Sequence, residues 1–92
     1  MIVQVKSSFQ KDLRKCPKRI QVLVVEVIEK LEMAGDLPAA NLDVTKMIQS
    51  KKTNYYRIRV GDWRIGCELI EPAILLMRIL TRGDIYKAFP PK

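Results

Sequence analysis

The arginines of residues 54–70 (NYYRIRVGDWRIGCELI) are the side chains of this sequence best suited to chemistry. The stretch alternates apolar and basic residues with the period of a strand, breaks at residues 61–62 and resumes, which predicts a β-hairpin. Side chains two apart on a strand share a face, so one face of the hairpin carries Arg57, Arg59 and Arg64. The planar guanidinium group binds phosphate through two parallel hydrogen bonds. We therefore expect this arginine face to bind an anion such as phosphate.

The strand that follows decides where two further arginines point. A two-residue turn at 71–72 directs Arg78 into the core. A three-residue turn at 71–73 instead pairs Gly66 with Arg78, and it also brings Arg82 to the arginine face. Burying an unpaired arginine costs far more free energy than lengthening a turn, so we predict the three-residue turn.

Little in the sequence neutralises the arginine face. Glu68 is the one acidic side chain that the hairpin places on it, and Gly66 leaves room for a nucleotide to approach the sheet. The alternatives are a solvated basic face and a face covered by an acidic chain. Trp63 could stack on a base, but its pairing with Val60 predicts a place on the apolar face and packing in the core.

Composition restricts the possible functions. The 92 residues make one domain, residues 1–92, and the net charge of +7 favours an anionic partner, either nucleic acid or an acidic protein. The sequence has no histidine, which excludes a His-based metal site and a Ser-His-Asp triad. Cys16 and Cys67 lack the spacing of a zinc or redox motif and are expected to be free buried thiols. We expect no metal and no cofactor.

No segment of the sequence has the features of a membrane span or a secretion signal. The longest apolar stretches are interrupted by charged residues or proline and are shorter than the roughly 20 residues needed to cross a bilayer. The chain begins with the strand-like residues IVQVK directly after Met1, without the charged and apolar regions of a signal peptide. We expect a cytoplasmic protein that has no membrane partner.

The N-terminal half predicts one strand and two helices. Residues 2–6 are rich in β-branched side chains and predict a strand. A short helix follows, with Ser7 and Gln10 as a capping box, and it stops at Pro17. Apolar residues recur at helical spacing over residues 18–33 and predict a longer helix that Gly35 ends, although its valines leave a strand at 22–25 as the alternative.

The C-terminal half predicts a connector and three strands. Residues 36–53 form a polar connector with one turn of helix at 44–48. Alternating side chains then predict an antiparallel meander of strands at residues 55–60, 63–70 and 74–81. The order of elements predicts an α+β fold, in which two helices cover one face of a twisted antiparallel sheet.

Two segments, YYRIRVGDWRIGCEL and ILTRGDIYK, resemble the signature of the RelE/ParE toxin superfamily. The N-terminal strand, the two helices and the connector are similar in order and length to the elements of that superfamily, so the resemblance covers essentially the whole chain. Members similar to RelE cleave messenger RNA in the ribosomal A site, whereas members similar to ParE keep the fold but poison DNA gyrase. Both kinds are paired with an antitoxin, so the resemblance implies a cognate antitoxin as partner.

The resemblance also assigns roles to individual residues. The basic pair on the first hairpin strand of the family falls on Arg57 and Arg59, its central arginine on Arg64, its late-strand arginine on Arg82 and its C-terminal tyrosine on Tyr86. Four features depart from the family. Thr81 stands where histidine is common, Gly83 stands where a basic residue is common, and arginines stand where the RelE branch prefers lysines. In addition, Pro90-Pro91 is expected to leave no C-terminal helix.

These residues lead to a hypothesis of ribosome-dependent cleavage of messenger RNA without a metal. Arg64 and Arg82 would hold the phosphate and stabilise its developing charge, and Tyr86 would stack on a base or transfer a proton. The alternative for Tyr86 is a structural role as a core or edge aromatic. The side chains expected to bind the RNA backbone are Arg57, Arg59, Arg78, Lys51 and Lys52. The alternatives are a toxin that acts on gyrase and an inactive relative that binds only its antitoxin.

Overall fold

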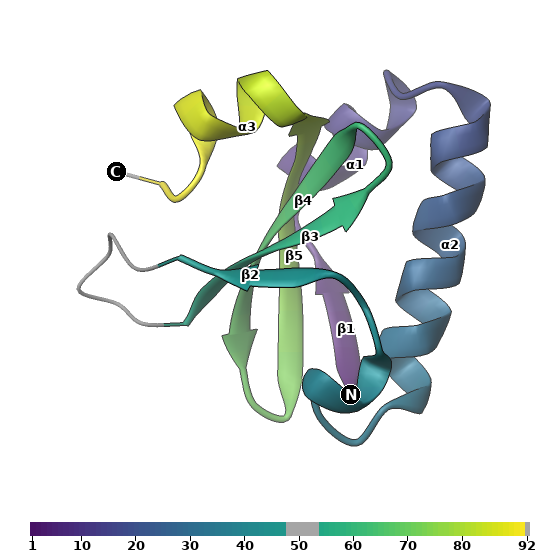
Figure 1. Cartoon of the computed structure of the whole chain (residues 1–92), viewed down its shortest axis with the longest axis vertical. Helices are drawn as coiled ribbons and strands as arrows, with labels where there is room; N and C mark the ends of the chain where they lie inside the picture. The colour runs from purple at the N-terminus through teal and green to yellow at the C-terminus, as the bar shows by residue number, and fades with distance from the viewer. Residues whose placement is uncertain (48–53, 92) are drawn as a thin grey trace.

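The computed structural model describes residues 1–47 and 54–91 and has the predicted α+β fold. A five-stranded sheet with strand order β1-β5-β4-β3-β2 forms its centre (Figure 1). Helices α1 and α2 pack on one face of the sheet, and α3 packs on the other. In chain order the elements are β1 (Ile2–Val5), α1 (Ser7–Arg14), α2 (Lys18–Met33), the 3-10 helix η1 (Pro38–Ala40), β2 (Val44–Lys46), β3 (Tyr55–Val60), β4 (Trp63–Ile70), β5 (Ala73–Thr81) and α3 (Arg82–Ala88).

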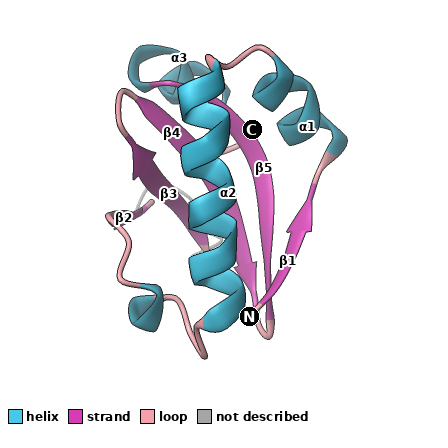
Figure 2. Cartoon of the chain, turned by 90° about the vertical axis from the view of Figure 1, so that its right-hand side faces the viewer, coloured by secondary structure: helices cyan, strands magenta, loops and turns pink. Residues whose placement is uncertain are grey.

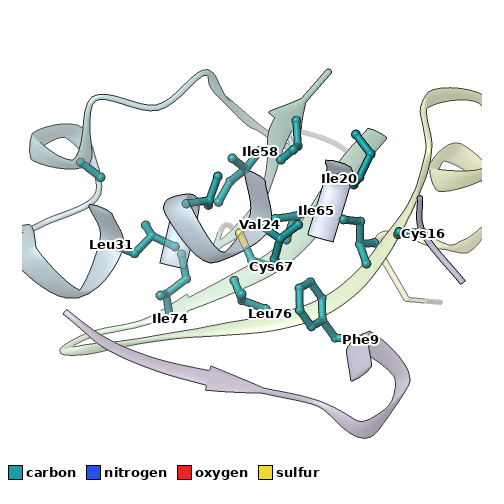
Figure 3. Close-up of a cluster of buried hydrophobic side chains, with 14 of the residues drawn as sticks. Phe9, Cys16, Ile20, Val24, Leu31, Ile58, Ile65, Cys67, Ile74 and Leu76 are labelled. Carbon is teal, nitrogen blue, oxygen red and sulfur yellow. The ribbon is translucent and has the colours of Figure 1, made fainter. Parts of the chain in front are cut away.

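The main core lies between α2 and the sheet. Buried residues recur on α2 at intervals of four, three and four, at Ile20, Val24, Val27 and Leu31, so the predicted helix is confirmed and the alternative strand is wrong. These side chains meet the inward face of the sheet, including Ile58, Ile65 and Cys67 (Figure 3). Each fully buried aliphatic side chain contributes about 1.5 to 3 kcal/mol through the hydrophobic effect, which offsets the low helix propensity of the valines. Trp63 packs against this cluster, as predicted.

The sheet is mixed rather than antiparallel. Strand β1 pairs with β5 in parallel, with Val3 opposite Ile74, whereas all the other strand pairs are antiparallel. The prediction of an antiparallel sheet was wrong because side-chain alternation indicates a strand but not the direction of its neighbour. That direction depends on where the two helices return the chain, and here the first and last strands become neighbours.

The connector contains a fifth strand that the sequence did not reveal. A turn of 3-10 helix lies at Pro38–Ala40, and Val44–Lys46 forms strand β2, so the helical turn predicted at residues 44–48 is wrong over its described part. Three residues are too few to show alternation. The strand forms because its backbone pairs with the free edge of β3, where Thr45 lies opposite Arg57.

The hairpin of β3 and β4 has the predicted register, from Val60 opposite Trp63 to Tyr56 opposite Cys67. Gly61 has a φ of +59°, which glycine adopts without steric cost and which permits the tight turn. The next turn is shorter than predicted, because Ile70 pairs directly with Ala73. A bulge in β5 then shifts the register between Gly66 and Cys67, so that Gly66 still lies opposite Arg78. The predicted pair is therefore confirmed, but the predicted three-residue turn is wrong.

Helix α1 covers the part of β5 that extends beyond the end of β1. The predicted capping box is wrong, because Lys6 is the N-cap residue and no side chain caps the helix. Instead, the Ser8 hydroxyl donates a hydrogen bond to the Met77 carbonyl at 2.6 Å. The Asp12 carboxylate accepts one from the Ile79 amide at 3.1 Å. Polar side chains of α1 therefore satisfy the backbone of a strand edge that has no neighbouring strand there.

A C-terminal helix is present, contrary to the sequence prediction. Helix α3 begins after Thr81, whose hydroxyl accepts a hydrogen bond from the Asp84 amide at 3.3 Å. Buried Ile85 and Phe89 fix this end of the chain on the outward face of the sheet, where they form a second cluster with Tyr55 and Met77. Seven residues were too few for the helical pattern to stand out, and the proline pair that follows ends the helix without preventing it.

Gly66 makes room for the α3 end of the chain rather than for a ligand. A methyl group at Gly66 would lie 2.5 Å from Cγ of Phe89, so only glycine lets this ring approach the sheet. The expectation that a nucleotide approaches the sheet at Gly66 was therefore wrong. In residues 1–47 and 54–91, no helix is long and apolar enough to span a membrane.

Candidate functional site

Tyr86 and Arg57 form the centre of the candidate site. Tyr86 lies on the exposed side of α3 and is 64% exposed, so it is neither a core nor an edge aromatic. The guanidinium carbon of Arg57, on β3, lies 4.5 Å from the centre of the Tyr86 ring, which is a cation–π contact. Helix α3 holds the tyrosine there because Ile85, the preceding residue, is fully buried against the sheet.

Two further arginines approach the same tyrosine. Hydrogen bonding to Arg57 lowers the pKa of Tyr86 below its usual value of 10, and the positive charges of Arg57, Arg82 and Arg64 lower it further. The strands explain why these residues meet. Trp63, next to Arg64, lies opposite Thr81, next to Arg82. The Arg82 amide also donates a hydrogen bond to the Asp62 carbonyl at 2.9 Å, which ties the start of α3 to the hairpin turn.

Arg64 is held in place by the backbone of its own turn. Its Nη1 atom donates hydrogen bonds to the carbonyl oxygens of Gly61 at 2.8 Å and Trp63 at 2.9 Å. The guanidinium group has five N–H donors, so most of them stay available to a ligand. The turn therefore fixes the direction of Arg64 without neutralising its charge.

The two ion pairs among the described residues lie elsewhere. Arg59 is 3.9 Å from a carboxylate oxygen of Asp43 in an exposed pair, and Arg78 forms a two-pronged pair with Asp12. We define the arginine cluster as Arg57, Arg64 and Arg82. Within residues 1–47 and 54–91, no carboxylate lies within ion-pair distance of these three side chains. Their charge is available to an anionic ligand.

The structure thus brings together some of the predicted site residues and separates others. Arg57, Arg64 and Arg82 lie around Tyr86, whereas Arg59 turns toward Asp43 beside β2. The predicted RNA-binding residues Lys51 and Lys52 lie outside the described residues.

Arg78 is not part of the arginine cluster, because it pairs with a carboxylate that the sequence did not reveal as its partner. Asp12 accepts hydrogen bonds from Nε of Arg78 at 2.7 Å and from Nη2 at 3.1 Å, and this bonding raises the pKa of Arg78. The signal was present in the sequence, because Asp12 lies three residues after Phe9 and four before Cys16, on the apolar face of α1. A carboxylate on such a face needs a buried cation or backbone amides as partners.

The cysteines are not candidate nucleophiles. Cys16 and Cys67 are free and buried, as predicted. Burial raises the pKa of Cys67 to about 12 and also raises the pKa of Cys16, where the charge of Asp12 adds to the effect. Both thiols stay protonated near neutral pH and belong to the core.

Comparison with known proteins identifies the class to which this fold and site belong. Residues 3–86 match the family described as the ParE toxin of the type II toxin-antitoxin system parDE. The chain is 39% identical over 83 residues to Toxin RelE3 of Methanocaldococcus jannaschii. The aligned region covers 90% of this chain and 92% of that protein. The chain therefore belongs to the ParE toxin family, within the RelE/ParE superfamily of type II toxins.

Solved structures agree with this assignment. The toxin in the RelB-RelE antitoxin-toxin complex of Methanococcus jannaschii has a TM-score of 0.78 and 36% identity, covering 95% of this chain and 99% of that one. The archaeal RelE-RelB complex of Pyrococcus horikoshii OT3 has a TM-score of 0.72 and 25% identity, covering 89% of this chain and 94% of that one. YafQ of E. coli shares the fold, with a TM-score of 0.67, 21% identity and coverage of 91% of this chain and 96% of that one.

Proposed function

We propose that this toxin is a ribosome-dependent endoribonuclease that cleaves messenger RNA without a metal and so inhibits translation. The observation that supports the proposal is the arginine cluster. Its three guanidinium groups have no carboxylate partner among the described residues, and they lower the pKa of one exposed tyrosine, Tyr86. Charge of this kind, fixed in place and unneutralised, suits a phosphodiester whose negative charge increases in the transition state.

The proposed reaction is an attack of the ribose 2′-hydroxyl on the adjacent phosphorus atom. The 2′-oxygen loses its proton, the new P–O bond forms, and the bond to the 5′-oxygen breaks as that oxygen gains a proton. Arg64 and Arg82 hold the phosphate and stabilise its charge. Tyr86 serves either as a stacking surface for a base or as a proton acceptor, and Arg57 positions it from the sheet.

Orientation carries much of the rate in this proposal. Arginine stays protonated at neutral pH and is a poor general base, and tyrosine acts as one only through its lowered pKa. The sequence has no histidine, and in residues 1–47 and 54–91 no carboxylate forms an ion pair with the arginine cluster. The ribosome would compensate for the lack of an efficient general base by holding the messenger RNA against the arginine cluster in a reactive geometry. Cleavage is therefore proposed to depend on the ribosome.

A cognate antitoxin is the proposed regulatory partner. The two archaeal relatives of at least 25% identity were solved as complexes of RelE with RelB. The present chain has a net charge of +7, and its arginine cluster has no carboxylate partner among the described residues. An antitoxin with an acidic segment would bind this surface and exclude RNA from it.

Primer extension on a defined messenger RNA tests the proposal. The purified protein is added to a reconstituted translation reaction and, separately, to naked RNA. We expect cuts within ribosome-occupied codons and none on naked RNA. Intact RNA in both reactions would overturn the nuclease proposal.

Two sets of variants assign the cleavage to the arginine cluster. The double substitution Arg64→Ala, Arg82→Ala should abolish cleavage and growth inhibition, since each lost phosphate contact lowers the rate by about 10² to 10³-fold. The fold should persist because neither side chain fills the core. Arg19→Ala removes an exposed arginine of α2 and should leave cleavage unchanged. Full toxicity of the folded double variant would contradict the proposed site.

The match to the ParE family supports one alternative, action on DNA gyrase. Gyrase supercoiling and DNA-cleavage assays with the purified protein test this alternative directly. Intact RNA together with gyrase inhibition would favour a ParE-like toxin. Intact RNA with active gyrase would favour a relative that only binds its antitoxin.

A further inference from the structure

The outer side of α2 carries exposed valines. Helix α2 lies across one face of the sheet (Figure 2). Val22 is 55% exposed and Val25 is 52% exposed, on the side of the helix opposite to its buried residues. Lys18 and Glu29 extend the same line at intervals of four, three and four residues, the spacing that keeps side chains on one helical face. We call Lys18, Val22, Val25 and Glu29 the α2 ridge. It has two apolar residues at its centre, a cation at one end and an anion at the other.

The charges of the α2 ridge are placed against the dipole of their own helix. Lys18 is the first residue of α2, the first turn has no acidic residue, and Glu29 lies near the C-terminal end. A helix favours anions at its N-terminus and cations at its C-terminus, so Lys18 is unfavourable in the isolated helix, and Glu29, just before the last turn, is weakly unfavourable. Neither forms an ion pair with another residue in the described part of the chain. The ridge therefore has charges without partners and apolar side chains without cover.

We propose that the α2 ridge is the interface of a symmetric dimer in which the α2 helices of two copies pack antiparallel. The two-fold axis passes between positions 22 and 25. Val22 then faces the partner's Val25, and Lys18 faces the partner's Glu29. Each contact occurs twice, as a two-fold axis requires. The two helix dipoles also oppose each other in this arrangement.

A second copy of this chain fits the ridge because the ridge is complementary to itself. Under the two-fold axis, position i faces position 47 − i, which places valine on valine and lysine on glutamate at the same time. A shift by one helical turn would set a valine against a charged side chain and would leave Lys18 without its anion. A parallel pair would place lysine against lysine and glutamate against glutamate, which is repulsive.

The contact is small, so the dimer should be weak. The ridge spans eleven residue steps, which is about 16 Å at 1.5 Å per residue. A contact of this length buries less than the roughly 1,600 Å² of a standard stable interface. We expect dissociation constants of about 10 to 100 µM.

The dimer would leave the arginine cluster open. Helix α2 packs on one face of the sheet, whereas Arg57 and Arg64 project from the other face, where α3 also lies. Two clusters would therefore face away from each other in the dimer. The proposal does not depend on the nuclease proposal, because assembly is measured without RNA, ribosomes or gyrase.

Sedimentation equilibrium of the purified protein over a range of concentrations tests the dimer. The original chain should show a concentration-dependent increase from the monomer mass to the dimer mass. Lys18→Glu and Glu29→Lys should each weaken the dimer at least tenfold, because like charges then face each other across the two-fold axis. Neither change should impair folding, because each places the charge that the helix dipole favours. Circular dichroism and thermal melting check this.

Mixing the two variants provides the sharpest test. One variant then has glutamate at both charged ridge positions and the other has lysine at both, so all the cross-contacts attract. We expect dimers in the mixture at concentrations where each variant alone is monomeric. Lys30→Glu, an exposed change on α2 off the ridge, makes the same change in net charge as Lys18→Glu and should not weaken the dimer.

Three results would overturn the proposal. The original chain could remain monomeric up to millimolar concentration. It could form a dimer that neither Lys18→Glu nor Glu29→Lys weakens, which would place the interface elsewhere. The mixed variants could also show no more association than each variant alone.

Discussion

The arginines on the outward face of the sheet lie in two different environments. At the edge of β5 beside α1, Arg78 is held by Asp12 at 2.7 and 3.1 Å, and its side chain is 34% exposed. Around Tyr86, the arginine cluster has no carboxylate within ion-pair distance among the described residues. Strand alternation places Arg78 on the same face as Arg57 and Arg64, so alternation alone does not separate the two environments. An arginine is therefore structural where a packed helix brings an anion to it, and available to a ligand where no such anion approaches.

The two faces of the sheet differ in how they are packed. The inward face meets α2 and α1 in one continuous cluster, whereas the outward face has a small cluster under the short helix α3 (Figures 1 and 3). Substitutions on the inward face should therefore change the stability of the whole domain. Substitutions on the outward face should act locally, on the position of α3 and on the chemistry of Tyr86.

The largest effect is expected from Ile65→Ala on the inward face. Ile65 is fully buried, and truncation leaves a cavity between β4 and α2. We expect a loss of about 4 kcal/mol in the free energy of unfolding, within the range for buried Ile→Ala changes. Urea denaturation followed by circular dichroism measures it. Leu23→Ala, at a 39% exposed position of α2, is the control and should cost far less. Equal losses for the two variants would contradict the assignment of the core.

Asp12→Ala should have the next largest effect. The change leaves Arg78 without its anion and the Ile79 amide without its acceptor. We expect the free energy of unfolding to fall by about 3 kcal/mol. This value is at the lower end for a broken buried ion pair, because Arg78 is partly exposed and can be hydrated. Urea denaturation again measures the loss. Asp43→Ala, which breaks the exposed pair with Arg59, should cost less than about 1 kcal/mol. A similar loss in both variants would remove the contrast between the buried and the exposed pair.

Gly66→Ala should act on the outward face alone. The added methyl group would lie 2.5 Å from Cγ of Phe89, so α3 must move away from the sheet. We expect overpacking to weaken the packing of α3 on the sheet by about 1 to 3 kcal/mol. Any activity that needs Tyr86 beside Arg57 should be lost as well. Hydrogen exchange should increase in α3 and stay unchanged in α2. Gly83→Ala is the control, because a methyl group there meets nothing within 4 Å. Unchanged exchange in α3 would show that the Phe89 ring is not what Gly66 accommodates.

The smallest change in stability is expected from Arg57→Ala, below about 0.5 kcal/mol for a surface position. Its effect should appear in the titration of Tyr86, because Arg57 is the main cause of the lowered pKa. Removing Arg57 should move that pKa up toward 10. The pKa in the native protein lies below that of the unfolded chain, so the original protein gains stability as the pH rises through the native pKa. The Arg57→Ala variant should gain less stability than the original protein over the same rise in pH.

Ultraviolet absorbance of tyrosinate measures this titration. The spectrum of the Tyr86→Phe variant is subtracted at each pH to remove Tyr55 and Tyr56. Arg59→Ala is the matched control, since Arg59 points to Asp43 and is not among the causes of the shift. An unchanged titration after Arg57→Ala would show that the arginine does not contact the tyrosine in solution.

Much of the fold and part of the candidate site could be predicted from the sequence alone. Helical spacing fixed α2 from Lys18 to Met33, and strand alternation fixed the register of β3 and β4. That alternation separated the arginines of the hairpin from its apolar residues. These features are local, because they depend on side chains a few residues apart and on the need to bury one face.

Other features depended on contacts between distant segments. The parallel pairing of β1 with β5, the bulge near Gly66 and the pairing of Arg78 with Asp12 each join parts of the chain that lie far apart in the sequence. The position of Tyr86 over Arg57 depends in turn on α3 and on the Phe89 ring beside Gly66. A periodic pattern shows which side of an element is apolar but not which distant partner will cover it. The sequence alone therefore determined which arginines could form a site, and the tertiary structure decided which of them remain without a partner, because only packing brings a carboxylate within reach.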